Sequence, residues 1–257
     1  MKKRYFHIIH KKNDIYLKGS KRAVLLLHSF TSNANEMRGV AKHLHSLGYT
    51  CYAPNYAGHG TTPEDFFTSS IEAVWQSAKK AFHFLKQEGY DKIFLIGQSL
   101  GGVMALRLAS DPCCQALVAM SSPLFERPID GLEQRVRNYT ERHFHFQQKS
   151  DTWIDEYVQQ HFPRPTEKMR ALQQFIVDTR HVLSTVRCPI CLCKGRLDDD
   201  VYQESIDFIG NHVHSTYKET WTYEQSGHLL TLGKERKQLH TDIEQFLQKF
   251  KKRAYFS

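Results

Sequence analysis

The chain has 257 residues, of which 40% are hydrophobic and 24% charged, ordinary values for a soluble globular protein. Its length fits one α/β domain with a modest insertion, residues 1–257, better than two domains. The formal charge of +8 raises the question of an anionic partner, but the basic residues are spread along the chain apart from Lys2-Lys3-Arg4 and Lys251-Lys252-Arg253. We therefore expect no nucleic-acid binding.

Features of membrane or secreted proteins are not evident in the sequence. No apolar run approaches the roughly 20 residues of a membrane span. The residues that follow Lys2-Lys3-Arg4, from Tyr5 to Lys12, do not form the apolar core of a signal peptide. We expect a cytoplasmic protein without stable membrane insertion.

Short apolar runs alternate with longer amphipathic segments along most of the chain. The apolar runs predict strands over residues 23–27, 49–53, 93–96, 116–120, 189–193 and 217–223. Helical spacing predicts helices over residues 35–47, 71–85, 99–109, 202–209 and about 235–250. Strands that are apolar throughout are buried on both faces, which is typical of a mostly parallel sheet flanked by helices.

The alternation stops between about residues 123 and 186, a segment rich in charged and aromatic side chains. Helices are predicted near residues 131–147, 151–161 and 166–179. A segment of about 60 residues is too short for an ordinary independent domain, so we expect a helical insertion that lies over the sheet.

The six cysteines include a C-x-x-C sequence from Cys188 to Cys191, which alone could be redox-active or half of a zinc site. A second C-x-x-C is missing, and the adjacent Cys113 and Cys114 are poor partners for a zinc knuckle. Cys191 and Cys193 fall within the apolar run 189–193, where free cysteine behaves as a small hydrophobic residue. We interpret them as core residues and expect no metal site.

The strongest local signal is Gly97-Gln98-Ser99-Leu100-Gly101, a G-x-S-x-G between a predicted strand and a predicted helix. A serine on this tight turn exposes its hydroxyl at the edge of the sheet, and small residues on both sides let the helix approach the strand. The amide of Leu100 lies at a helix N-terminus, where it could stabilise a developing oxyanion. A phosphate-binding turn is the rival interpretation, but the glycine spacing does not fit one.

A serine hydroxyl needs a neighbouring imidazole to accept its proton. In folds with this strand–turn–helix serine, the acid and then the histidine follow in the chain, with the histidine after the last strand. Among 15 histidines, His228 directly follows the predicted strand 217–223. His240 lies within the final predicted helix, while His212 and His214 precede that strand, so we assign His228 as the base.

The acid is expected just after strand 189–193, where Asp198, Asp199 and Asp200 stand in a row. Its task is to fix the tautomer of the imidazole and to stabilise the imidazolium. Asp198 is the preferred candidate because the turn after the strand would aim it at His228, with Asp199 as its main competitor. Asp199 and Asp200 are otherwise interpreted as solvated residues or as the start of the next helix.

The loop His28-Ser29-Phe30-Thr31-Ser32 follows the first central strand, at the same end of the sheet as Ser99. A backbone amide from this loop supplies the second oxyanion donor in such folds, and Phe30 is the candidate. We interpret His28 as a brace for the loop rather than as a base.

With these motifs in this order, the sequence resembles the α/β-hydrolase family, over roughly residues 23–250. Within it, the sequence is similar to small bacterial carboxylesterases and monoacylglycerol-lipase-like esterases of Bacillus type. The resemblance rests on these segments: Leu27-His28-Ser29-Phe30-Thr31, residues 48–54, Gly58-His59-Gly60, Ser99-Leu100-Gly101-Gly102, Asp198 and residues 223–228.

The resemblance implies catalytic roles for Ser99, Asp198 and His228, oxyanion amides at Phe30 and Leu100, and a small helical cap at the insertion. It implies neither a metal nor an organic cofactor. The family usually has His-Gly where this chain has His28-Ser29, and the added Cβ is expected to narrow the acyl site or restrict the loop.

The expected function is therefore serine carboxylesterase activity on a small-molecule ester, either a short- to medium-chain carboxylic ester or a monoacylglycerol. Aromatic residues of the insertion are expected to line an apolar acyl pocket. A thioesterase, another hydrolase of a non-ester bond, and a non-catalytic binding protein remain as alternatives, since a triad does not choose the leaving group.

Overall fold

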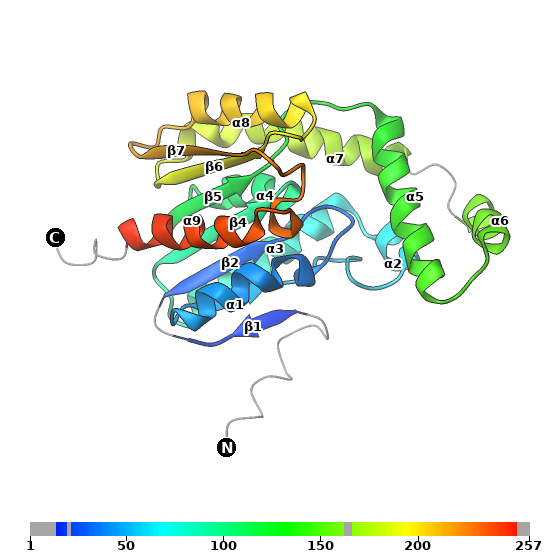
Figure 1. Ribbon diagram of the computed structural model, residues 1–257, viewed down its shortest axis with the longest axis horizontal. Coiled ribbons are helices and arrows are strands. Elements are labelled where there is room, and N and C mark those ends of the chain that lie inside the picture. Colours follow the sequence, from blue (N-terminus) through cyan, green and yellow to red (C-terminus); the bar gives the residue numbers. More distant parts are fainter. Residues whose placement is uncertain (1–13, 20–21, 162–165, 251–257) are drawn as a thin grey trace, which may run out of the picture.

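The computed structural model describes residues 14–19, 22–161 and 166–250. The two terminal basic runs lie outside these residues, as does Phe162, one of the aromatic residues of the segment 123–186. Within the described ranges, seven strands form one sheet in the order β1-β3-β2-β4-β5-β6-β7 (Figure 1). Strand β1 is antiparallel to β3, and every other neighbouring pair is parallel. The predicted α/β-hydrolase fold, with a mostly parallel sheet between helices, is confirmed.

The strands are β1 (Ile15–Leu17), β2 (Ala23–Leu27), β3 (Thr50–Ala53), β4 (Ile93–Gln98), β5 (Cys114–Met120), β6 (Ile190–Gly195) and β7 (Lys218–Tyr223). The α-helices are α1 (Arg38–Ser46), α2 (Pro63–Thr68), α3 (Ile71–Gln87), α4 (Leu100–Leu108), α5 (Ile129–Phe146), α6 (Asp151–His161), α7 (Thr166–Asp178), α8 (Asp200–His212) and α9 (Arg236–Lys249). The short 3-10 helices are η1 (Ala34–Met37), η2 (Thr179–Thr185) and η3 (Leu230–Leu232).

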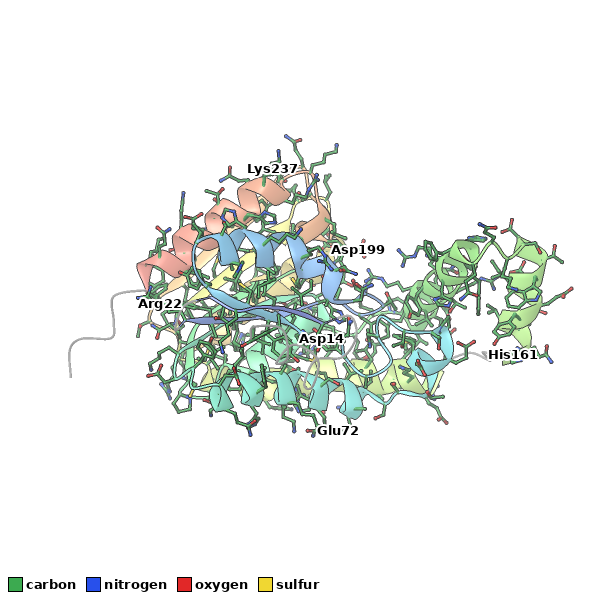
Figure 2. All side chains as sticks on the ribbon, turned by 90° about the horizontal axis from the view of Figure 1, so that it is seen from below. Asp14, Arg22, Glu72, His161, Asp199 and Lys237 are labelled. Carbon is green, nitrogen blue, oxygen red and sulfur yellow. The ribbon has the colours of Figure 1, made fainter. Side chains whose placement is uncertain are left out.

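Successive residues of the central strands face two separate hydrophobic cores, as the period of two in a strand requires. Leu25 and Leu27 of β2 pack into the core formed with α3, α4 and α8. Val24 and Leu26 of the same strand pack into the core formed with α1 and α9. Both layers of helices are visible on either side of the sheet (Figure 2). The continuous apolar runs thus arise from burial on both faces.

One strand and one α-helix were missing from the sequence prediction. Strand β1 has three residues and pairs with β3 at the edge of the sheet, too short for a periodic signal. Helix α2 has six residues, but its start carries a recognisable signal. The Thr62 hydroxyl accepts a hydrogen bond from the Asp65 amide, and Pro63 occupies the first turn.

Between β5 and β6 the chain forms α5, α6 and α7, within two residues of the predicted helices. Helices α5 and α6 extend beyond the end of the sheet in both views, and α7 runs back along the body (Figures 1 and 2). Helix α6 packs on α5 through a small cluster that is separate from the two main cores and is centred on Phe144 and Ile154.

Cys191 and Cys193 on β6 are fully buried in the core shared with α1 and α9, in agreement with the interpretation as core residues. The Sγ atoms of Cys114 and Cys188 lie 3.4 Å apart, in hydrogen-bond contact. Among the residues that the structure describes, no cluster of His, Cys, Asp and Glu side chains has an arrangement that could hold a metal ion.

Candidate active site

Four loops converge at the carboxyl ends of the parallel strands. They follow β2, β4, β6 and β7 and carry Phe30, Ser99, Asp198 and His228, respectively. Because β2, β4, β5, β6 and β7 are all parallel, these ends lie along one edge of the sheet. This is the edge at which open α/β sheets bind ligands.

Ser99 lies between β4 and α4 with φ 55° and ψ −119°, a backbone conformation that non-glycine residues rarely adopt. Its amide is held by the Met120 carbonyl oxygen at 2.8 Å. A Cβ on Gly97 would overlap the Gly101 carbonyl, and a Cβ on Gly101 would overlap the Leu27 carbonyl. The two glycines therefore permit the close approach of strand and helix that holds Ser99 in this turn.

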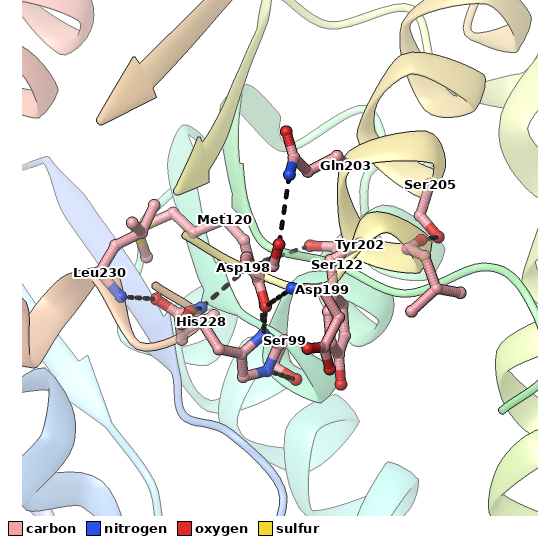
Figure 3. Close-up of polar contacts among 12 residues, drawn as sticks. Ser99, Met120, Ser122, Asp198, Asp199, Tyr202, Gln203, Ser205, His228 and Leu230 are labelled. Atoms are coloured by element: carbon pink, nitrogen blue, oxygen red, sulfur yellow. Dashed lines mark hydrogen bonds and ion pairs between the residues drawn. The ribbon is translucent and has the colours of Figure 1, made fainter. Parts of the chain in front are cut away.

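His228 connects Ser99 to Asp198 (Figure 3). Its Nε2 lies 2.9 Å from Ser99 Oγ, and its Nδ1 lies 3.0 Å and 3.2 Å from the two carboxylate oxygens of Asp198. Asp198 Oδ1 also accepts a hydrogen bond from the Asp199 amide at 2.9 Å. The structure thus brings together the three residues that the sequence predicted, in the order hydroxyl, imidazole, carboxylate.

The competing candidates have other contacts. Asp199 pairs with Arg127 at 2.9 Å, and Asp200 begins α8. His240 lies in α9, and its ring centroid is 5.7 Å from that of His43. None of these three candidates contacts Ser99.

The surroundings of His228 favour its neutral form. Burial lowers the pKa of its imidazole, and the positive charges of Arg135 and Arg127 lower it further, while the Asp198 carboxylate opposes these effects. The Tyr202 ring packs against the imidazole with 4.0 Å between centroids. A neutral imidazole with Nδ1–H bonded to the carboxylate leaves Nε2 free to accept the serine proton.

The two predicted oxyanion donors lie on either side of Ser99. The Leu100 amide is the first of α4, and Phe30 follows β2 in the loop beside the serine turn. Neither amide donates a hydrogen bond to another residue of the described ranges. Both are therefore available to an oxygen that binds beside Ser99.

The structure shows what Ser29 contacts. Its hydroxyl donates to Glu36 Oε1 at 2.8 Å, and its amide donates to the same oxygen at 3.1 Å. Burial raises the pKa of the Glu36 carboxyl, and these hydrogen bonds oppose that effect. Ser29 thus ties the Phe30 loop to η1, which agrees with the expectation that its side chain restricts this loop.

His28 braces the same loop, as expected. Its Nδ1 lies 2.8 Å from the Ser29 carbonyl oxygen, and its ring stacks on Tyr56 with 3.8 Å between centroids. The Tyr56 hydroxyl donates to the His28 carbonyl oxygen at 3.0 Å. Burial lowers the pKa of His28 well below its ordinary value. It does not contact Ser99 Oγ.

Gln98 has a role that sequence reasoning missed. The side chain is fully buried, and its Nε2 donates to the His228 carbonyl oxygen at 2.8 Å while its Oε1 accepts from the Leu230 amide at 3.1 Å. It therefore ties the loop that carries His228 to the strand that carries Ser99. The signal was a long polar residue at the end of an otherwise apolar strand.

Comparison with known proteins assigns the chain to a family. The sequence profile of the α/β-hydrolase family described as "Serine aminopeptidase, S33" matches residues 18–237. The chain belongs to this family. It is 36% identical over 232 residues, or 90% of the chain and 94% of the relative, to a protein of Bacillus subtilis (strain 168) named carboxylesterase.

A second relative of the hydrolase is a thermostable monoacylglycerol lipase of Bacillus sp. (strain H-257). The two are 25% identical over 93% of the chain and 94% of the relative. Among solved structures, a metagenome-derived lipolytic enzyme has a TM-score of 0.73 at 21% identity, over 92% of this chain and 97% of its own. The monoacylglycerol lipase of Paleococcus ferrophilus has a TM-score of 0.66 at 16% identity, over 91% and 98%. These likenesses support the fold.

A cavity of about 510 Å³ adjoins the site of the hydrolase at His228, and neither Ser99 nor Asp198 lines it. Phe30, His228 and Leu229 line it together with residues of α5. The described residues that α5 contributes to the lining are polar: Arg135, Asn138, Glu141, Arg142 and His145. No aromatic residue of the insertion is among the described residues that line this cavity, and the expectation of an apolar acyl pocket lined by them stays a prediction.

The aromatic residues of the insertion form contacts elsewhere. Phe144, Trp153 and Tyr157 pack on one another between α5 and α6, with ring centroids 4.7 to 5.1 Å apart. Phe125 packs on Phe208, Tyr139 on Phe66 and Phe175 on Trp75, and Phe146 is 91% exposed. Composition gives only the number of aromatic residues, whereas their positions along each helix determine which side of the helix each ring occupies.

A larger cavity, of about 730 Å³, lies beside α3 and the end of β3 and is lined by Asp14, Asn55 and His83 among others. None of Ser99, Asp198 and His228 lines it.

In the described part of the chain, none of the helices combines the length and the apolar character needed to cross a membrane.

Proposed function

We propose that this hydrolase is a serine carboxylesterase that cleaves short- to medium-chain carboxylic esters or monoacylglycerols through an acyl-enzyme. The observation that carries the proposal is the hydrogen-bonded series Ser99 Oγ, His228 Nε2 and Nδ1, and Asp198. The names of the Bacillus relatives support the choice of an ester bond.

In the first half-reaction, Ser99 Oγ attacks the ester carbonyl carbon while His228 Nε2 accepts the hydroxyl proton. The amides of Phe30 and Leu100 donate to the oxyanion of the tetrahedral intermediate. When the intermediate collapses, the C–O bond to the alcohol breaks and His228 returns the proton to the leaving oxygen. Asp198 stabilises the imidazolium that exists between these steps.

In the second half-reaction, water replaces the alcohol. His228 Nε2 accepts a proton from water, the hydroxide attacks the acyl carbon, and the proton passes to Ser99 Oγ as the acid leaves.

We assign the segment 123–186 as a helical cap in which α5 covers the cavity. Residues of this helix and the loop at residues 29–31 line the same cavity, which supports that assignment.

The test is hydrolysis of p-nitrophenyl esters with acyl chains of two to twelve carbons. We expect turnover by the native protein and a decrease of at least about 10,000-fold in kcat for Ser99→Ala. Ser110→Ala, which changes an exposed serine at the end of α4, is the matched control and should leave kcat unchanged. Absence of ester turnover, or equal turnover by Ser99→Ala, would refute the proposal.

Thioesters of the same acyl chains, tested in parallel, address the alternative leaving group. A higher kcat/KM on the thioester than on the matched oxygen ester would favour a thioesterase. A protein that turns over neither class and does not react with a fluorophosphonate would be a non-catalytic binding protein.

A further inference from the structure

The polar face of α5 that covers the cavity is one continuous stripe. Arg135, Asn138, Arg142 and His145 are spaced three or four residues apart, so they lie on the same side of the helix. All four line the cavity together with His228. A group that occupies this cavity beside His228 therefore lies next to this stripe.

The carboxylates of this region already have partners. Glu141, which also lines the cavity, pairs with Arg137 at 2.7 Å. Asp198 is bound by His228 at 3.0 Å. His145, at the end of the stripe, lies 2.7 Å from Asp151. These contacts leave the positive charges of the remaining stripe residues unbalanced within the cavity.

Arg135 is the half-buried cation of the stripe. Within the ranges that the structure describes, its guanidinium has neither a carboxylate partner nor a hydrogen-bond acceptor, and lies 5.9 Å from the Tyr202 ring centroid. The same ring packs against the His228 imidazole, with 4.0 Å between centroids. The positive charge of Arg135 lowers the pKa of His228, so Arg135 lies within electrostatic range of the reacting atoms.

Arg142 lies two turns further along α5 and is exposed at the cavity. Its Nε donates to the Asn138 carbonyl of its own helix at 3.1 Å, and no carboxylate of the described residues pairs with it. Two guanidinium groups without acid partners among the described residues thus line the cavity that His228 also lines. A planar guanidinium binds a carboxylate through two parallel hydrogen bonds, with a strength that neutral donors do not reach.

We propose that the preferred substrate of this site is an ester that itself carries a carboxylate, which Arg135 binds with help from Arg142. This inference rests on the proposed esterase function and specifies its substrate class. The carboxylate lies on the acyl part, as in a half-ester of a dicarboxylic acid, or on the alcohol part, as in an ester of a hydroxy acid. Arg135 is then a specificity-determining residue rather than a member of the triad.

Matched pairs of esters test this inference, each pair differing only in a carboxylate or its neutral amide. The acyl pair is mono-p-nitrophenyl adipate and p-nitrophenyl adipamate, and the alcohol pair is p-acetoxybenzoate and p-acetoxybenzamide, with all rates corrected for hydroxide hydrolysis. The native enzyme should favour the carboxylate of at least one pair by about tenfold or more in kcat/KM, mainly through KM. The pair that shows the preference identifies the side that carries the anion.

Arg135→Gln should remove the preference, so that kcat/KM becomes equal for the carboxylate and the neutral amide of the pair, and urea unfolding shows whether the variant is folded. Arg135→Lys should retain part of the preference for the carboxylate, since the charge remains but the bidentate hydrogen bonding is lost. Lys149→Gln is the matched control, because it removes one positive charge from the same region at a residue that does not line the cavity. It should leave the preference intact.

Equal kcat/KM for carboxylate and amide in both pairs would overturn the inference and leave the esterase function standing. A preference that persists unchanged in Arg135→Gln would also overturn it. Absence of turnover of all four esters would instead refute the esterase function, and this inference with it.

Discussion

His228 is held by three neighbours of different kinds. Asp198 binds its Nδ1, the Tyr202 ring packs on its imidazole, and Gln98 binds its backbone carbonyl. The first contact sets the tautomer and the second limits the access of water. The third fixes the distance of the loop from Ser99. Only the contact with Asp198 could be predicted from motifs, because Tyr202 and Gln98 occupy positions at which no motif specifies the residue.

The lowered pKa of His228 predicts the pH dependence of ester hydrolysis. Protonation of the imidazole removes the base, so kcat/KM rises with pH through the pKa of the folded enzyme and then levels off. Because burial lowers this pKa below its ordinary value of about 6.5, the midpoint should lie below pH 6.5. Arg135→Gln removes a nearby positive charge and should raise the midpoint. A midpoint at or above pH 6.5 in the native enzyme would contradict this view of the site.

Gln98→Leu should impair both stability and turnover. The leucine leaves the His228 carbonyl and the Leu230 amide without a partner, and buried unsatisfied groups cost about 1–3 kcal/mol in the free energy of unfolding. Urea unfolding measures this loss, and kcat should decrease because the His228 loop is no longer tied to β4. Gln115→Leu, a half-buried glutamine bonded to the Phe250 carbonyl, is the control. A wild-type kcat in Gln98→Leu would exclude the positioning role.

At the scale of elements, the packing of α4 on the sheet determines where Ser99 lies. Apolar periodicity predicted both β4 and α4, and the G-x-S-x-G spacing predicted their close approach. The same reasoning missed β1, whose three residues are too few for a period. It also placed the start of the helix 35–47 as α-helical, whereas Ala34–Met37 forms the 3-10 helix η1. Short elements depend on tertiary contacts that a local pattern does not contain.

Gly101→Ala tests the close packing of α4. The new Cβ would overlap the Leu27 carbonyl, so the helix must shift, at a cost of about 1–3 kcal/mol or more in unfolding free energy. The shift also moves Ser99, and kcat should fall. Gly131→Ala is the matched control, because a Cβ there meets no atom within 4 Å and alanine favours the helix. Similar effects of the two substitutions on stability and kcat would contradict the assigned role of Gly101.

At the scale of the molecule, the sequence predicted the strands and α-helices in chain order apart from β1 and α2, and it predicted the three residues that the structure brings into hydrogen-bond distance at the site. It did so because each of these residues directly follows a strand with a recognisable pattern. The polar lining of the cavity could not be predicted, since it depends on which face of α5 turns toward the loop at residues 29–31. The local composition of the insertion suggested an apolar pocket, but its aromatic residues pack on one another between α5 and α6 or on rings of α2, α3 and α8.

The separate cluster between α5 and α6 predicts uneven stability across the molecule. Helix α6 is anchored mainly by Phe144, Ile154 and the hydrogen bond from Tyr157 to Glu64, at 2.7 Å. Hydrogen exchange should therefore be faster in α6 than in β4 and β5, because small peripheral clusters open at lower free energy than a central sheet. Uniform exchange across α6 and the sheet would contradict this prediction.

The same cluster predicts different outcomes for two phenylalanine deletions. Phe144→Ala should accelerate exchange in α6 with little effect on global urea unfolding. Phe94→Ala, in the core beneath the sheet, should lower the global free energy of unfolding by about 3–5 kcal/mol. Equal losses in global stability would show that α6 and the sheet unfold as one unit.

The central claim is that Ser99 is the nucleophile, activated by His228. Its most direct test is mass spectrometry of the protein after inactivation by a fluorophosphonate, with residual ester hydrolysis measured on the same samples. We predict one covalent adduct per chain, on Ser99, with activity lost in proportion to labelling and with no adduct in Ser99→Ala. An adduct on another residue, or full activity in a protein labelled at Ser99, would contradict the assignment.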